Sequence, residues 1–144
     1  MKILVDADAC PVKEIIVRLA KQRNIPVTMI CDTSHRLNDG YSKIITVDTQ
    51  ADSVDFALIG LLSHEDIVIT QDYGVAAMTL GKGARAINQN GLVYTNENMD
   101  MLLMERHIGA KVRRSGGRTK GSPKRTKEDN ERFEAVFAEL LDSV

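Results

Sequence analysis

Two aspartates separated by one residue follow the first apolar run of the chain. Residues 2–13 read KILVDADACPVK, so Asp6 and Asp8 end a short strand pattern, and the next basic residue is Lys13. Side chains at the carboxyl end of a parallel strand lie at the sheet edge where open α/β folds bind ligands. Two carboxylates this close repel each other unless a cation or a proton intervenes. The pattern therefore predicts a Mg²⁺ or Mn²⁺ site, of a kind that acts on phosphate esters.

Three further aspartates occupy comparable positions. Asp72 follows the strand pattern DIVIT, and if that strand neighbours the first one, the two strand ends lie roughly 5 Å apart. Asp52 and Asp55 are three residues apart at the start of an apolar segment, which places them on one face of a helix N-terminus. We interpret the whole set as candidate metal ligands: Asp6, Asp8, Asp52, Asp55 and Asp72.

Each of these aspartates also has a structural interpretation. Asp is a common helix N-cap, so Asp8 could cap the helix that follows it. Asp72 before Gly74 fits an Asx-turn, and the spacing of Asp52 and Asp55 is that of a self-capping helix start. The convergence of separate acids on strand ends and helix starts favours the site.

Alternating strand and helix patterns would position these residues. Strands are expected at 2–5, 27–31, 43–47, 66–70 and 84–87, with a possible edge strand at 92–94. Helices are expected at 11–23, 52–62, 73–80 and 96–107, and after Thr126. The order predicts an α/β fold, in which a mainly parallel sheet lies between two helical layers. The length of 144 residues fits one domain spanning 1–144.

Charge is distributed unevenly along the chain, although the net charge is only −1. Residues 111–127 carry eight Lys or Arg and no acid, whereas residues 128–144 carry six acids and one base. A Gly- and Ser-rich basic arm is a natural contact for a phosphate backbone, because neutralised phosphates release counterions. The alternative is a solvated linker that pairs loosely with the acidic last segment. The arm contains no aromatic residue, so it would contact the backbone and not the bases.

The segment after the arm reads as a helix that must dock. Thr126 and Asp129 have the spacing of a capping box. The apolar face of this helix comprises Phe133, Val136, Phe137, Leu140 and Leu141. We therefore expect the basic arm to be tethered at both ends.

Other classes of protein are disfavoured. No run approaches the roughly 20 apolar residues of a membrane span, and the N-terminus lacks a signal-peptide pattern. Cys10 and Cys31 belong to no zinc-like cluster, and we expect both to be small buried residues in a reducing cytoplasm. Neither a P-loop nor a G-x-G-x-x-G pattern follows the first strand.

Several segments together resemble the YaiI/YqxD family of bacterial proteins over essentially the whole chain. These are VDADACPVK, ADSVD, DIVITQD, KGARAI, GLVYTNENM and an RSGGRTKG arm leading to a helix. The resemblance implies a PIN-like, three-layer α/β/α domain related to PIN and FLAP-type nucleases. Asp6, Asp55 (or its neighbour Asp52) and Asp72 match their acidic positions, and Asp8 is an extra acid. PIN nucleases usually carry a further acid after the third, which YGVAAMTLGKGA does not supply.

The resemblance implies a divalent-metal-dependent nuclease acting on RNA or DNA. Asp6, Asp55 and Asp72 would hold Mg²⁺ or Mn²⁺, which generates a hydroxide and stabilises the leaving oxygen. Asp8 completes the candidate catalytic set, since Asp8 or Asp52 would hold a second ion or orient a metal-bound water. PIN relatives often dimerise, so a homodimer is also expected. The candidate residues for binding the nucleic-acid backbone are Lys13, Arg36, Arg113, Arg114, Arg118, Lys120, Lys124 and Arg125.

Two alternatives remain open. The segment DADAC imitates the D-x-D-x-[TV] start of haloacid-dehalogenase-like phosphatases, although Cys10 stands where Thr or Val is expected. The other alternative is a nucleic-acid-binding or adaptor protein that keeps a PIN-like scaffold without catalysis. The missing fourth acid favours this second alternative, while retention of the other aspartates argues against it.

Overall fold

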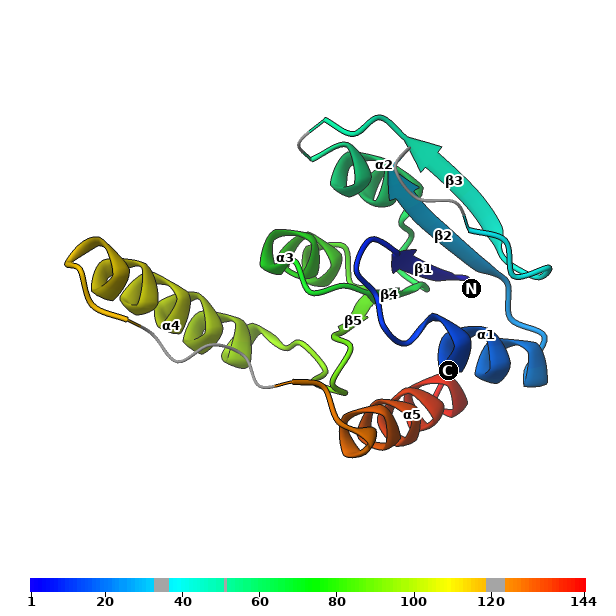
Figure 1. Ribbon diagram of the computed structural model, residues 1–144. Coiled ribbons are helices and arrows are strands. Elements are labelled where there is room, and N and C mark those ends of the chain that lie inside the picture. The colour runs from blue at the N-terminus through cyan, green and yellow to red at the C-terminus, as the bar shows by residue number, and fades with distance from the viewer. Residues whose placement is uncertain (33–36, 51, 119–123) are drawn as a thin grey trace.

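The computed structural model describes residues 1–32, 37–50, 52–118 and 124–144 of the chain (Figure 1). The strands are β1 (Ile3–Asp6), β2 (Val27–Asp32), β3 (Lys43–Val47), β4 (Ile67–Ile69) and β5 (Arg85–Ile87). The helices are α1 (Lys13–Gln22), α2 (Ser53–Leu61), α3 (Tyr73–Gly81), α4 (Asn96–Arg114) and α5 (Lys127–Asp142). The five strands confirm the expected segments to within about two residues at each end.

The strands form one parallel sheet in the order β3-β2-β1-β4-β5. β1 is central: Ile3 pairs with Val27 of β2 on one side and with Ile67 of β4 on the other. The predicted neighbourhood of the first and fourth strands is therefore correct. Because all strands run in the same direction, their carboxyl ends share one edge of the sheet.

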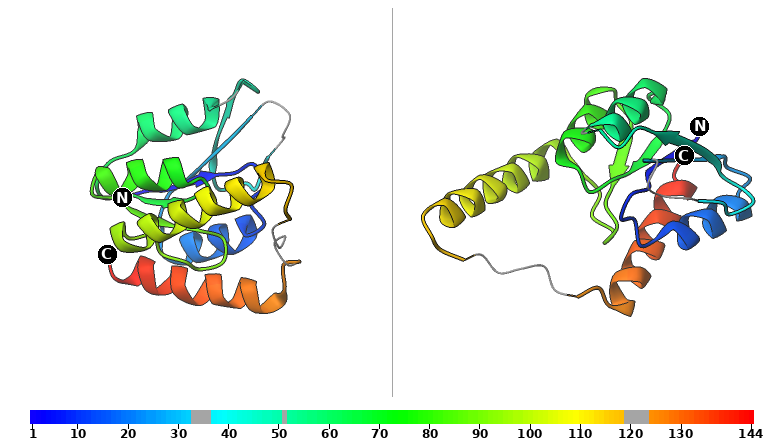
Figure 2. Two further views of the ribbon diagram at one scale, coloured as in Figure 1. Left: turned by 90° about the vertical axis from the view of Figure 1, so that its left-hand side faces the viewer. Right: turned by 45° about the horizontal axis from the view of Figure 1, so that its top comes forward.

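Helices cover both faces of the sheet. Alternate residues of β1 point to opposite faces, so Ile3 and Val5 join the apolar cluster beneath α1 and α5. Leu4 joins a second cluster, under α2, α3 and the first turns of α4. Figures 1 and 2 show the same two layers. The fold is a three-layer α/β/α sandwich, as expected.

The final helix docks as its apolar face predicts. Thr126 Oγ1 accepts a hydrogen bond from the Asp129 N–H, and an Asp129 carboxylate oxygen accepts one from the Thr126 N–H, which completes the capping box. Phe133 and Phe137 are fully buried, with stacked rings 5.2 Å apart. Their burial fixes α5 against the sheet and α1.

The prediction that the fourth helix ends at residue 107 is wrong. α4 continues to Arg114, so residues 111–114 of the basic arm form its last turn. The good helix formers Ala110 and Lys111 carry the helix past Gly109, and basic side chains favour a helix C-terminus. The possible edge strand at 92–94 reduces to an isolated antiparallel bridge between Val93 and Ile87.

Two expectations about the class of protein can be compared with the structure. Cys10 and Cys31 are free and buried, as predicted. Among the helices of the described segments, none combines the length and the apolar character needed to cross a membrane.

Candidate carboxylate site

Asp6 and Asp72 meet at the carboxyl-terminal edge of the sheet. Asp6 is the last residue of β1, and Asp72 is the N-cap residue of α3, just beyond the paired strand β4. One carboxylate oxygen of Asp72, Oδ1, accepts the Val75 N–H at 3.0 Å. An Asx-turn, the structural interpretation of Asp72, would use the Gly74 N–H two residues on; the side chain instead caps α3 through the Val75 N–H. Its second oxygen, Oδ2, is not needed for the cap.

The hydroxyl of Thr70 joins the two strand ends. Thr70 Oγ1 donates to Asp6 Oδ2 at 3.0 Å and accepts the Asp72 N–H at 3.0 Å. The Tyr94 hydroxyl in turn donates to the Thr70 carbonyl oxygen at 3.1 Å. Thr70 is only 2% exposed, so it fixes the separation of β1 from the start of α3.

Acidic neighbours disturb the titration of this site. Burial, and after it the charges of Asp55, Asp8 and Asp72, together raise the pKa of Asp6 to about 6, against the hydrogen bond from Thr70, which lowers it. The pKa of Asp55 is also raised, by burial and then by Asp72 and Asp52. Three predicted ligands from separate parts of the chain, Asp8, Asp55 and Asp72, are therefore close enough to repel Asp6. Strong mutual perturbation of this kind is typical of functional sites.

Asp8 and Asp52 do not act as the side-chain caps that their positions allowed. The N-cap residue of α1 is Val12, and the Asp8 carboxylate instead accepts the Asp32 N–H at the end of β2. Asp52 is the N-cap residue of α2 but makes no side-chain cap. It has a left-handed backbone with φ 67°, as does Ala9 with φ 57°. Left-handed non-glycine residues are strained and cluster at functional sites.

A small pocket lies between the carboxyl ends of β1 and β4. Its volume is about 30 Å³, which is enough for a water molecule or a single cation. Asp6 and Asp8 contribute carboxylates to its wall, and the remaining lining residues are Cys10, Ile69, Thr70, Gln71 and Gln89. Across the residues that the structure describes, no group of three or more His, Cys, Asp or Glu forms a ready metal cage. The donor set fits Mg²⁺ or Mn²⁺ all the same, because Mg²⁺ uses one or two carboxylates and keeps its waters.

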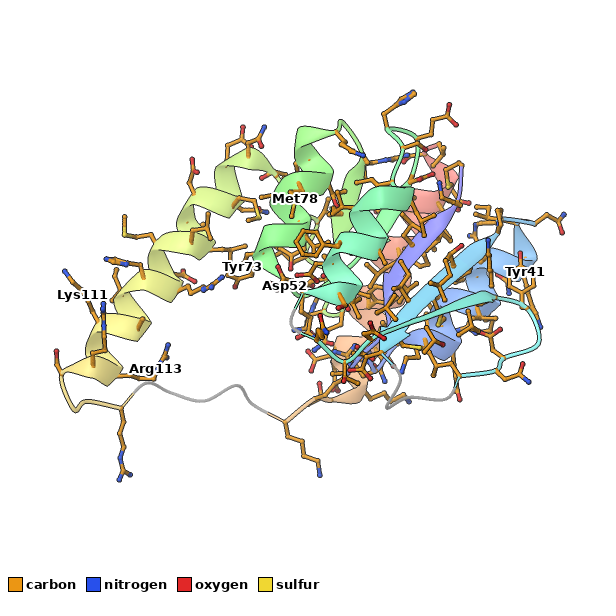
Figure 3. All side chains as sticks on the ribbon, turned by 90° about the horizontal axis from the view of Figure 1, so that it is seen from above. Tyr41, Asp52, Tyr73, Met78, Lys111 and Arg113 are labelled. Carbon is orange, nitrogen blue, oxygen red and sulfur yellow. The ribbon has the colours of Figure 1, made fainter. Side chains whose placement is uncertain are left out.

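The predicted phosphate-binding residues are spread over the molecule. Lys13 begins α1. Burial raises the pKa of the nearby Cys10 thiol, and the charge of Lys13 opposes that rise. Figure 3 shows Lys111 and Arg113 at the projecting end of α4, away from Asp52. Arg114, Arg118 and Lys124 are exposed. Arg36 and Lys120 lie outside the described residues.

Arg125 has a structural role that the sequence did not reveal. Its guanidinium donates to Asn130 Oδ1 at 2.7 Å, to Asn90 Oδ1 at 2.5 Å and to the Gln89 carbonyl oxygen at 2.7 Å. Gln89 lines the carboxylate pocket. The start of α5 thereby holds one wall of the site in place.

Sequence reasoning missed three polar residues of the site: Thr70, Gln71 and Gln89. The signal for Thr70 and Gln71 was their position between a buried strand and Asp72 in DIVITQD, where parallel strands place ligand-binding side chains. Gln89 follows the short strand β5 in the same way. Its hydrogen bond to Gln71 joins positions distant in sequence, which no local pattern could reveal.

Comparisons with known proteins identify relatives of the whole chain. The chain is 64% identical over 137 residues to a UPF0178 protein of Ruminiclostridium cellulolyticum, covering 95% of this chain and 90% of the relative. A UPF0178 protein of Clostridium acetobutylicum is 58% identical over 143 residues, covering 98% and 97%. No solved structure matches the chain. The family model described as "Uncharacterized BCR, YaiI/YqxD family" matches residues 4–143, and the chain therefore belongs to the YaiI/YqxD family.

Proposed function

We propose that the protein is a divalent-metal-dependent nuclease that hydrolyses phosphodiester bonds of RNA or DNA. The observation that carries the proposal is the burial of Asp6 beside Asp8, Asp55 and Asp72; burial first, and then these charges, raise its pKa to about 6. Uncompensated acids at the carboxyl edge of a parallel sheet destabilise the fold, and a bound cation would remove that cost. A PIN-like ancestry, expected from the sequence, agrees with this arrangement.

The residues of the site have distinct roles in this proposal. Asp6, Asp55 and Asp72 would hold Mg²⁺ or Mn²⁺, and Asp8 or Asp52 would hold a second ion or orient a bound water. The metal supplies an activated water and stabilises charge on the leaving oxygen. Thr70 orients Asp6 through its hydroxyl. Asp72 keeps a fixed direction because its Oδ1 is bound to the Val75 N–H.

Basic groups around the acids would bind the substrate backbone. Lys13 and the N–H groups at the start of α1 would bind one phosphate of the substrate, because no side-chain cap occupies those N–H groups. The end of α4 and the arm after it supply more distant charge, so the expected contact is non-specific and salt-dependent. A cytoplasmic location is part of the proposal, because free buried thiols suit a reducing compartment.

Metal binding is the first test. We would titrate Mn²⁺ and Mg²⁺ by calorimetry into the wild type and into Asp6→Asn/Asp72→Asn. The control variant Glu65→Gln/Glu139→Gln also removes two carboxylate charges, at exposed acids that lie away from the site. Circular dichroism would confirm that all three proteins are folded. We expect micromolar-to-millimolar binding that the control keeps and the double variant loses.

Cleavage of labelled RNA and DNA is the second test. Metal-dependent cleavage lost in Asp6→Asn/Asp72→Asn would support the nuclease. Metal and oligonucleotide binding without cleavage would instead support a non-catalytic nucleic-acid-binding protein. Cleavage of a small phosphomonoester alone would favour the phosphatase. If the wild type takes up no metal even with an oligonucleotide present, the metal-dependent proposal fails.

A further inference from the structure

The outer face of α4 carries an exposed apolar stripe. Met101 is 59% exposed, Met104 58%, Ile108 53% and Val112 38%. Their spacings of three, four and four residues place them on one side of the helix. Met99 is 5% exposed and packs into the core from the other side. α4 therefore has two apolar faces, of which one is buried within the monomer.

The second half of α4 projects away from the body of the protein. Figures 1 and 2 show this end extending beyond the sheet and the other helices. Residues 103–108 and 111–114 are all exposed. A helical segment this short is marginal in water without tertiary contacts, and large side chains in one exposed stripe usually mark an interaction surface. This segment needs a partner.

Charge along α4 identifies that partner. The first half carries the acids Glu97, Asp100 and Glu105, and the last turn carries Lys111, Arg113 and Arg114. An antiparallel copy of the same helix brings each acidic half against a basic end. Asp100 and Lys111 are eleven residues apart, about three turns, and so lie on one flank of the stripe. In a two-fold arrangement, Asp100 meets Lys111 of the partner subunit, and the pair occurs twice.

We propose that α4 pairs antiparallel with α4 of a second copy of this chain. The register that matches the charges sets Met104 against Ile108 of the partner subunit and Met101 against Val112 of the partner subunit. A nucleic acid would fit this surface poorly, because the acidic first half repels phosphates. The contact is short compared with a standard interface, so the dimer is weak and depends on protein concentration.

Sedimentation of the full-length chain over a concentration series tests the proposal. We expect the wild type to pass from monomer to dimer between about 1 and 300 μM, the range in which small interfaces associate. Ile108→Asp and Met104→Lys should each weaken association at least tenfold. Lys is a good helix former, so Met104→Lys keeps α4 intact. Val144→Asp, at an apolar residue 63% exposed elsewhere, is the matched control and should leave association unchanged.

A charge swap tests the antiparallel geometry separately. Asp100→Lys and Lys111→Asp should each weaken the dimer, because each places like charges opposite one another. The double variant Asp100→Lys/Lys111→Asp restores opposite charges across the two-fold axis and should recover association. Single variants that weaken the dimer without recovery in the double variant would overturn this geometry. A wild type that stays monomeric at every concentration, or a dimer unaffected by both stripe variants, would overturn the pairing.

Hydrogen exchange gives a readout that does not depend on mass. Protection of residues 103–114 should rise with protein concentration in the wild type, since pairing buries this segment. Protection should stay low in Met104→Lys at all concentrations. Strong protection in a monodisperse monomer would show that the helix end is stable alone and would contradict the proposal.

Discussion

Asp66 and Asp6 lie at opposite edges of the same sheet, and their surroundings shift their pKa values in opposite directions. Asp66 precedes β4 at the amino-terminal edge and is 1% exposed. Its carboxylate accepts from Lys2 Nζ at 2.7 Å, from the Lys2 N–H at 3.1 Å and from the Ser63 N–H at 2.9 Å. These donors hold its pKa below the usual value, although burial acts in the other direction. Asp66 is buried, paired and structural.

Asp6 ends the neighbouring strand at the opposite edge and has other acids for neighbours. Thr70 donates to it, but burial and the charges of Asp55, Asp8 and Asp72 raise its pKa to about 6. The difference between Asp66 and Asp6 is therefore one of partners. A carboxylate with a cation stabilises the fold, whereas a carboxylate among carboxylates destabilises it and is available to bind an external cation.

Removing the charge of Asp66 should have the largest effect on stability. Asp66→Asn leaves the Lys2 ammonium without its counter-charge and should lower the free energy of unfolding by about 3 kcal/mol. Because the folded-state pKa lies below the unfolded value, this contribution is present above about pH 4 and is lost as the pH falls further. Urea unfolding at pH 7.5 and pH 3 measures both. Glu65→Gln, at an adjacent exposed acid, is the control; equal losses in the two variants would contradict the special role of Asp66.

Removing the charge of Asp6 should have the opposite sign. Asp6→Asn keeps an acceptor for Thr70 and should stabilise the protein at pH 7.5 by about 1–2 kcal/mol, after allowance for partial exposure. The folded-state pKa of Asp6 lies above the unfolded value, so the wild type regains stability as the pH falls from about 6 to 4. The advantage of the variant should therefore vanish near pH 4. Melting temperatures over pH 4–8 measure this, and a loss of stability at all pH values would contradict the crowding of acids.

The same melting-temperature comparison can be repeated with Mn²⁺ added. Mn²⁺ should raise the melting temperature of the wild type, because a ligand that binds only the folded state stabilises it. It should raise that of Asp6→Asn much less. An equal rise in both proteins would place the metal elsewhere.

The sequence predicted those features of the site that residues close together in the chain determine, and it predicted contacts between distant residues less well. The strand-end position of Asp6 and the docking of α5 were predictable, since the residues that determine them are local and periodic. The proximity of Asp6 and Asp72 followed from one topological assumption, that the first and fourth strands pair. The side-chain partners of the aspartates were harder to predict. An Asp beside an apolar strand has the same local sequence pattern whether or not a cation pairs with it, as Lys2 pairs with Asp66.

Contacts between distant segments account for most of what was missed. Arg125 reads as one more base in a basic arm, and only the folded chain brings it to Gln89 and Asn90. The extension of α4 to Arg114 was missed because Gly109 and the basic run resemble a linker. Helix propensity and the favourable position of basic residues at a helix end decided that case.

Thr70 offers a smaller test of the acidic end of the sheet. Thr70→Val removes the hydroxyl that donates to Asp6 and accepts from the Asp72 N–H, which should cost about 1 kcal/mol and raise the pKa of Asp6 further above 6. Thr70→Ser keeps the hydroxyl and is the matched control. NMR titration of the Asp6 carboxyl carbon and urea unfolding measure the two effects. An unchanged pKa in Thr70→Val would show that the hydroxyl does not orient Asp6.

A substitution at Gly74 should have the smallest effect on stability. It tests the role of Asp72 as the cap of α3 separately from its proposed role as a metal ligand. A Cβ at Gly74 would lie 3.1 Å from Asp72 Oδ1, so Gly74→Ala crowds the helix cap while it favours the helix by about 0.5–1 kcal/mol. These terms should nearly cancel in the wild type. In an Asp72→Ala background no cap remains to be crowded, and Gly74→Ala should then stabilise the protein by its full helical contribution. The double-mutant cycle, measured by urea unfolding, should therefore show a coupling of roughly 0.5 kcal/mol. A zero coupling would contradict the crowding, and would mean that the added methyl group leaves the bond between Asp72 Oδ1 and the Val75 N–H undisturbed.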